Sequence, residues 1–141
     1  MGAGLRAGTA YFVLVFLWGS ALGTGRTLFL EPRLGTVAAT MIELPLMLLL
    51  SWWLCGLVLS RHFVPASLKA RAAMGGLAFL LLMAAELGLS LYAVGGSVSG
   101  HFDAYREPAP LIGLAGQVLF ALLPLVRLRG AAMANSDLAS V

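Results

Sequence analysis

The ten residues 41–50 read MIELPLMLLL and place one carboxylate, that of Glu43, inside an otherwise apolar run. The run belongs to a longer apolar stretch, residues 36–59. As a helix this stretch is long enough to cross the hydrocarbon core of a bilayer, which is roughly 30 Å thick. An ionisable group at that depth costs about 2.5–3.5 kcal/mol to insert, so it usually faces the protein interior. The stretch therefore predicts a membrane-spanning helix that carries a buried acid.

The whole chain has the same apolar character. Of its 141 residues, 60% are hydrophobic and 11% are charged, and the mean hydropathy of +0.95 lies outside the usual range of soluble domains. Three more apolar stretches, residues 11–30, 72–95 and 110–126, are separated by short polar segments. We predict an all-α fold, an integral membrane four-helix bundle with short loops that forms one domain over residues 1–130. Residues 131–141 contain little apolar surface, and we expect them to form a flexible tail.

The basic residues predict the orientation of this bundle. Cytoplasmic loops of membrane proteins carry an excess of Lys and Arg, and six such residues flank the stretches on the side of the N-terminus, against two in the opposite loops. Both termini are therefore expected in the cytoplasm, and we expect the bacterial inner (cytoplasmic) membrane as the location. A cleavable signal peptide is an alternative for the first stretch, because a basic residue precedes it and small residues interrupt it. The six residues are Arg6, Arg61, Lys69, Arg71, Arg127 and Arg129, and the two are Arg33 and Arg106.

Several kinds of chemistry find no support in the sequence. Cys55 is the only cysteine, so an intramolecular disulfide and a cysteine-based metal cage are excluded. His62 and His101 fall on opposite sides of the predicted bundle, so they cannot clamp one haem. The scattered basic residues do not form the patch that nucleic acid binding requires. We predict no cofactor and no metal, and the sequence argues against an enzyme without excluding one.

Each apolar stretch carries one strongly polar side chain at a similar depth. With a rise of about 1.5 Å per residue, Glu43 and Gln117 lie about 10 Å from the outer end of their helices. On the same count, Glu86 lies roughly 13 Å and Arg26 roughly 6 Å from that end. We predict that these four side chains form a buried polar layer. Arg26 can pair with Glu43 or Glu86, which leaves one carboxylate to bind a proton, a cation or another donor.

Two further groups of residues surround this layer. Gly19 and Gly23 have the spacing that lets membrane helices approach closely, and we predict that they pack against a neighbouring helix. The segment around His101 is expected to be a solvated loop, although a metal site or an acid–base pair is an alternative. The predicted outer rim of the layer consists of Glu31, Arg33, His101, Asp103, Arg106 and Glu107.

These features leave two classes of function open. The primary prediction is a structural, assembly or complex-subunit protein, in which the polar layer only fixes which helices pair. Such a protein would contact the lipid bilayer and either copies of itself or another membrane protein. The alternative is a small proton- or cation-coupled transporter or channel that uses Glu43 or Glu86.

Overall fold

The computed structural model describes residues 2–93 and 95–139, with side chains described as far as residue 130. Helices account for almost all of these residues, and no strand occurs among them. The all-α prediction is therefore confirmed. Four of the helical stretches are long and apolar enough to cross a membrane, namely Gly2–Leu34, Thr36–Arg61, Leu68–Tyr92 and Pro108–Gly130.

The helical elements follow one another with few connecting residues. The first stretch consists of α1 (Gly2–Gly25), the π-helix η1 (Arg26–Leu30) and α2 (Glu31–Leu34). The second and third are α3 (Thr36–Arg61) and α4 (Leu68–Tyr92). A short helix, α5 (Val98–Asp103), and a 3-10 turn, η2 (Ala104–Arg106), then lead into α6 (Pro108–Ala139).

The first helical stretch is longer at both ends than the predicted range 11–30. At its outer end the chain stays helical past Pro32, whose missing N–H and bulky ring disturb the preceding turn. The amide of Glu31 bonds to the carbonyl of Arg26, five residues earlier, which is the spacing of a π-turn. The turn to α3 is made instead at Gly35, where φ is 80°, a conformation that favours glycine.

The last helix also continues further than the apolar pattern predicts. Its helical backbone extends through Ala139, beyond the predicted end at residue 126 and into the segment expected to be a flexible tail, residues 131–141. Residues 140 and 141 of that segment lie outside the described residues, and the flexibility of the tail stays a prediction.

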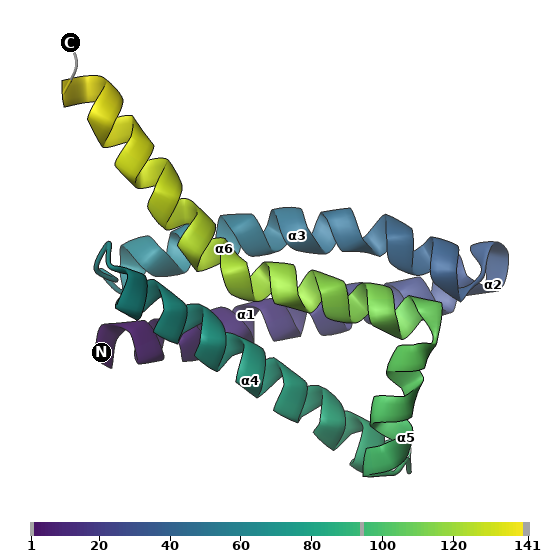
Figure 1. Ribbon diagram of the computed structural model, residues 1–141. Coiled ribbons are helices and arrows are strands. Elements are labelled where there is room, and N and C mark those ends of the chain that lie inside the picture. Colours follow the sequence, from purple (N-terminus) through teal and green to yellow (C-terminus); the bar gives the residue numbers. More distant parts are fainter. Residues whose placement is uncertain (1, 94, 140–141) are drawn as a thin grey trace.

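The helices run alternately up and down, so the two chain ends lie at the same end of the molecule (Figure 1). Helix α1 packs against α3 and α4, and α6 packs against the same two helices, while α4 diverges from α1 and α3 as it approaches its C-terminus (Figure 1). There α5 and η2 return the chain to the start of α6. The bundle therefore has a closed end, around Gly8, Tyr11 and Gly75, and an open end, between η1, α5 and the first turns of α6.

Glycines hold the closed end together. A Cβ added at Gly4 or Gly8 of α1 would lie 2.7 or 2.8 Å from a carbonyl oxygen of α4. One added at Gly75 of α4 would lie only 2.0 Å from a carbonyl oxygen of α6. The helices thus meet backbone to backbone, which small residues permit. These contacts also explain why α1 begins at Gly2, earlier than its apolar pattern indicates.

An aromatic pair fills the centre of the closed end. Tyr11 of α1 is fully buried and stacks on Phe120 of α6, with ring centroids 4.5 Å apart. Its hydroxyl lies 3.3 Å from the carbonyl oxygens of Ser51 and Phe120, so this polar group is satisfied by α3 and α6. Tyr11 therefore ties three helices together below the open end.

Candidate functional site

A cleft of about 670 Å³ occupies the open end of the bundle. All four long helical stretches line it, and so do α5 and η2. Most of its wall is apolar, with a few polar groups that converge from different helices, which is the usual make-up of a ligand-binding cleft. Its ionisable and amide side chains are Arg26, Glu31, Glu43, Glu86, His101, Tyr105 and Gln117.

Arg26 joins two carboxylates at one side of the cleft. Its Nε lies 2.6 Å from Oε2 of Glu43 on α3, and its Nη1 donates to the Glu31 carboxylate. Nη1 also lies 3.3 Å from the hydroxyl of Thr40. Arg26 is the first residue of the π-turn, and such turns inside α-helices are frequent at functional sites. One guanidinium group therefore pairs with carboxylates from two separate elements.

Glu86 has different surroundings on the opposite side. The side-chain amide of Gln117 donates to Oε1 of Glu86 over 2.5 Å. No Lys, Arg or His nitrogen lies within 4.0 Å of Glu86 in the part of the chain whose side chains are described. The remaining oxygen of the Gln117 amide is buried without a hydrogen-bond partner. Of the two acids that could pair with Arg26, Glu43 makes the ion pair. Glu86 instead accepts a hydrogen bond from the neutral amide of Gln117.

The charges that line the cleft do not balance. Three carboxylates, those of Glu31, Glu43 and Glu86, face the guanidinium group of Arg26 and the imidazole of His101. An excess of carboxylates over basic groups attracts a positive group. The lining of the cleft is therefore richer in acidic than in basic side chains.

The segment between α4 and α6 closes one wall of the cleft. The sequence predicts a solvated loop here, but the segment forms α5 and η2, because the Ser97 hydroxyl caps α5 by accepting the amide of Gly100 over 3.0 Å. His101 and Tyr105 lie one turn apart, with the Tyr105 hydroxyl 3.4 Å from Nε2 of His101. Burial raises the pKa of the Tyr105 hydroxyl and the Glu86 carboxylate raises it further. Tyr105 therefore keeps its proton at neutral pH.

The structure divides the residues of the predicted outer rim. Glu31 and His101 line the cleft. Asp103 and Arg106 form an exposed ion pair at 3.6 Å, which does not reach the cleft. Arg33 and Glu107 are exposed outside the cleft as well. No group of three His, Cys, Asp or Glu side chains that could hold a metal ion is found within the described residues.

The two glycines singled out in the sequence also line the cleft. A Cβ at Gly19 or Gly23 would touch side chains of α3 and no backbone atom. The close contacts between helix backbones are made instead by Gly4, Gly8 and Gly75, which the sequence reasoning missed. The first two have the same four-residue spacing as Gly19 and Gly23, and this spacing could have pointed to them.

Comparisons with protein-family models, with curated proteins and with solved structures found no match for this chain. The cleft and the surface of the bundle are therefore the features that bear on its function.

Proposed function

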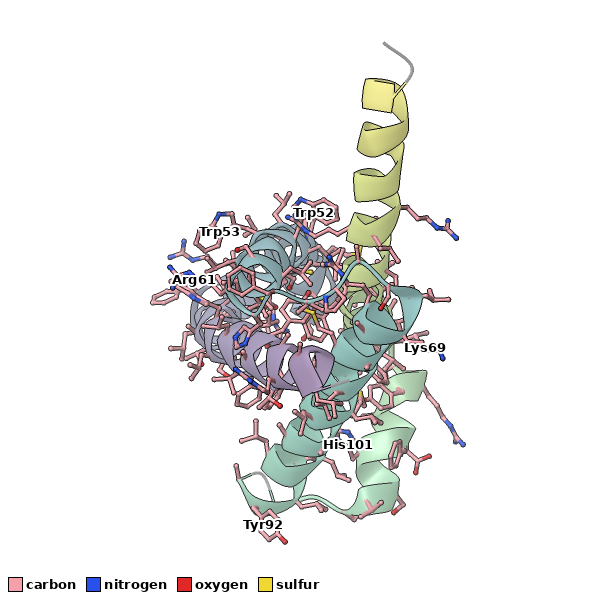
Figure 2. All side chains as sticks on the ribbon, turned by 90° about the vertical axis from the view of Figure 1, so that its left-hand side faces the viewer. Trp52, Trp53, Arg61, Lys69, Tyr92 and His101 are labelled. Carbon is pink, nitrogen blue, oxygen red and sulfur yellow. The ribbon has the colours of Figure 1, made fainter. Side chains whose placement is uncertain are left out.

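We propose that the chain is a multi-pass membrane protein of the bacterial inner membrane, with both termini in the cytoplasm. Its four long apolar helices support this proposal. Large apolar side chains also cover the outside of the bundle, with Leu49 68% and Leu80 66% exposed. Trp53 of α3 also points outward from the bundle (Figure 2). Apolar surface on this scale is costly in water and favourable against lipid.

Reporter fusions test the topology. A reporter joined after Arg61 or after Gly130 should score as cytoplasmic, and one joined after Gly100 should score as external, because the excess of basic residues keeps the first two sites inside. An external score for the fusion after Gly130 would contradict the proposed orientation.

Within the membrane, we propose that the cleft binds and passes a cation and that Glu86 is the group that binds it. The observation that carries this proposal is the contrast between Glu43, which is paired with Arg26, and Glu86, which has no cationic partner among the described side chains. An unbalanced carboxylate at membrane depth is costly, and such groups commonly mark ion or proton pathways. A purely structural layer has no need for an unbalanced acid.

Flux measurements on purified protein in liposomes test this role. We expect the protein to carry protons or a larger cation across the vesicle membrane, and Glu86→Gln to abolish the flux, since the substitution removes the charge and keeps the shape. Glu107→Gln is the matched control, because Glu107 is exposed and lies outside the cleft. Flux that survives Glu86→Gln in a folded bundle would refute the proposal.

A structural or subunit role is the second candidate, and the open side of the same cleft favours it. Helix packing within this chain already uses Gly4, Gly8 and Gly75, and the open side of the cleft is the place where we expect a partner to bind. Gly113 lines the cleft and a Cβ there would meet nothing within 4 Å. If the role is structural, a stoichiometric partner should co-purify after gentle solubilisation, and Gly113→Leu should displace it.

A further inference from the structure

We infer that the cation is an organic amine, a protonated primary or secondary amino group carried on an apolar body. This inference rests on the proposed function and specifies its substrate. Glu86 would bind the ammonium group and the apolar walls of the cleft would bind the body. The inference follows from the size of the cleft, its charge and the chemistry of its wall.

The volume of the cleft fits a small organic molecule. At about 670 Å³ it falls within the range of roughly 300–1,000 Å³ that small-molecule sites occupy. A proton or a bare inorganic ion needs only a few oxygen ligands and no space of this size. The cleft also has a glycine, Gly113, at a position where a side chain would extend into open space. The absence of a side chain at Gly113 therefore adds to the volume of the cleft.

The polar groups of the cleft accept hydrogen bonds from a positive donor. Oε1 of Glu86 receives one bond from the Gln117 amide, and Oε2 has no protein donor within the described residues. Oε2 is not fully enclosed, and Glu86 lines the cleft. A protonated amine supplies both the charge and the N–H that this oxygen lacks. A quaternary ammonium group would supply only the charge.

The rest of the wall suits an apolar body. Phe16, Leu82, Leu89 and Phe120 line the cleft together with the ring of Tyr105. Aliphatic and aromatic walls bind hydrocarbon groups, and an aromatic face also attracts a nearby ammonium ion. The wall is therefore unsuited to a strongly hydrated ion and suited to an amine with a hydrocarbon part.

Pairs of ligands that differ only in the amino group test the inference on the unaltered protein. Butylamine, phenethylamine and tryptamine can be compared by titration calorimetry in detergent with butanol, phenethyl alcohol and tryptophol, respectively. N-methylphenethylamine adds a secondary amine to the panel. We expect at least one amine to bind saturably and its alcohol to bind at least about tenfold more weakly, because the alcohol lacks the charge that Glu86 recognises. Equal binding of an amine and its alcohol would overturn the inference.

Variants locate the binding site. Glu86→Gln should weaken amine binding at least tenfold, whereas Glu107→Gln should leave it unchanged. Gly113→Leu should weaken it by filling the cleft, whereas Gly76→Leu should not, because Gly76 has open space around its Cβ and lies outside the cleft. Amine binding that survives both Glu86→Gln and Gly113→Leu would place the amine elsewhere and overturn the inference.

The flux assay separates failure of this inference from failure of the proposed function. If no amine of the panel binds, yet liposomes show proton or sodium flux that depends on Glu86, the inference is wrong and the proposed function stands. If there is neither amine binding nor flux of any cation, both are wrong. Amine binding that depends on Glu86 supports the inference whether or not flux is seen.

Discussion

The closed and open ends of the bundle are built from the same four helices but are held together in opposite ways. At the closed end, Gly8 and Gly75 let helix backbones touch, and Tyr11 stacks on Phe120 in a buried core. At the open end, charged and amide side chains project into a cleft of about 670 Å³. The helices therefore meet where small residues let them approach, and polar side chains lie in the space where the helices are apart.

This difference assigns a separate task to each end. Backbone contacts at glycine tolerate no added atoms, so the closed end can act as a rigid support. The open end has one carboxylate that is paired with Arg26, Glu43, and one without an ion-pair partner among the described side chains, Glu86. Such an arrangement keeps one acid as part of the scaffold and leaves the other available to a ligand.

The largest effect should come from breaking the closed end. Gly75→Ala should lower the free energy of unfolding by about 2–3 kcal/mol, because the new Cβ would lie 2.0 Å from a carbonyl oxygen of α6. Its neighbour Gly76 has open space at the same position, so Gly76→Ala should stabilise the helix by about 0.5–1 kcal/mol. Thermal unfolding of both variants in detergent checks the prediction, and similar stability of the two would contradict the glycine contact.

Removing the Arg26 side chain, which two carboxylates of the open end share, should have the next largest effect. Arg26→Leu leaves Glu31 and Glu43 without their common partner and should cost about 1–3 kcal/mol. Adding Glu43→Gln removes one of the two orphaned charges, so the double variant should be less damaged than Arg26→Leu alone. The double variant and both single variants can be compared by thermal unfolding. Strictly additive losses would exclude an energetic pairing of Arg26 with Glu43.

Smaller effects should distinguish the two carboxylates themselves. Glu43→Gln removes an ion pair with Arg26 and should lower the stability by about 0.5–1.5 kcal/mol. Glu86→Gln removes an uncompensated charge, so the stability should stay the same or rise. The order of the two melting temperatures is the readout, and a larger loss for Glu86→Gln would mean that Glu86 has a stabilising partner.

The features that depend on residue type and spacing could be predicted from the sequence. Apolar length is sufficient to indicate four long helices and an all-α fold. Counting the rise per residue places Arg26 and Glu43 at a comparable depth. In the structure, Nε of Arg26 lies 2.6 Å from Oε2 of Glu43. The same count could not choose between Glu43 and Glu86 as the partner of Arg26, because that choice depends on how the helices are rotated and spaced.

The features that depend on contacts between distant elements could not be predicted in this way. Gly75 of α4 meets α6 at Ala121, and nothing near Gly75 in the sequence identifies Ala121 as its neighbour. The participation of Glu31 depends on the π-turn that keeps the chain helical past Pro32. A proline near the end of an apolar run usually predicts a stop, although a helix can absorb it by widening one turn.

Thiol labelling compares the two ends directly, because the chain has a single natural cysteine at the closed end. Cys55 is fully buried, so it should stay unlabelled by a membrane-impermeant thiol reagent added from outside. In a Cys55→Ala background, Gly113→Cys places a thiol in the cleft and should be labelled rapidly from the same side. A protonated amine that binds the cleft should slow this labelling. Equal protection of the thiols at positions 55 and 113 would contradict an open, accessible cleft and the binding of a cation within it.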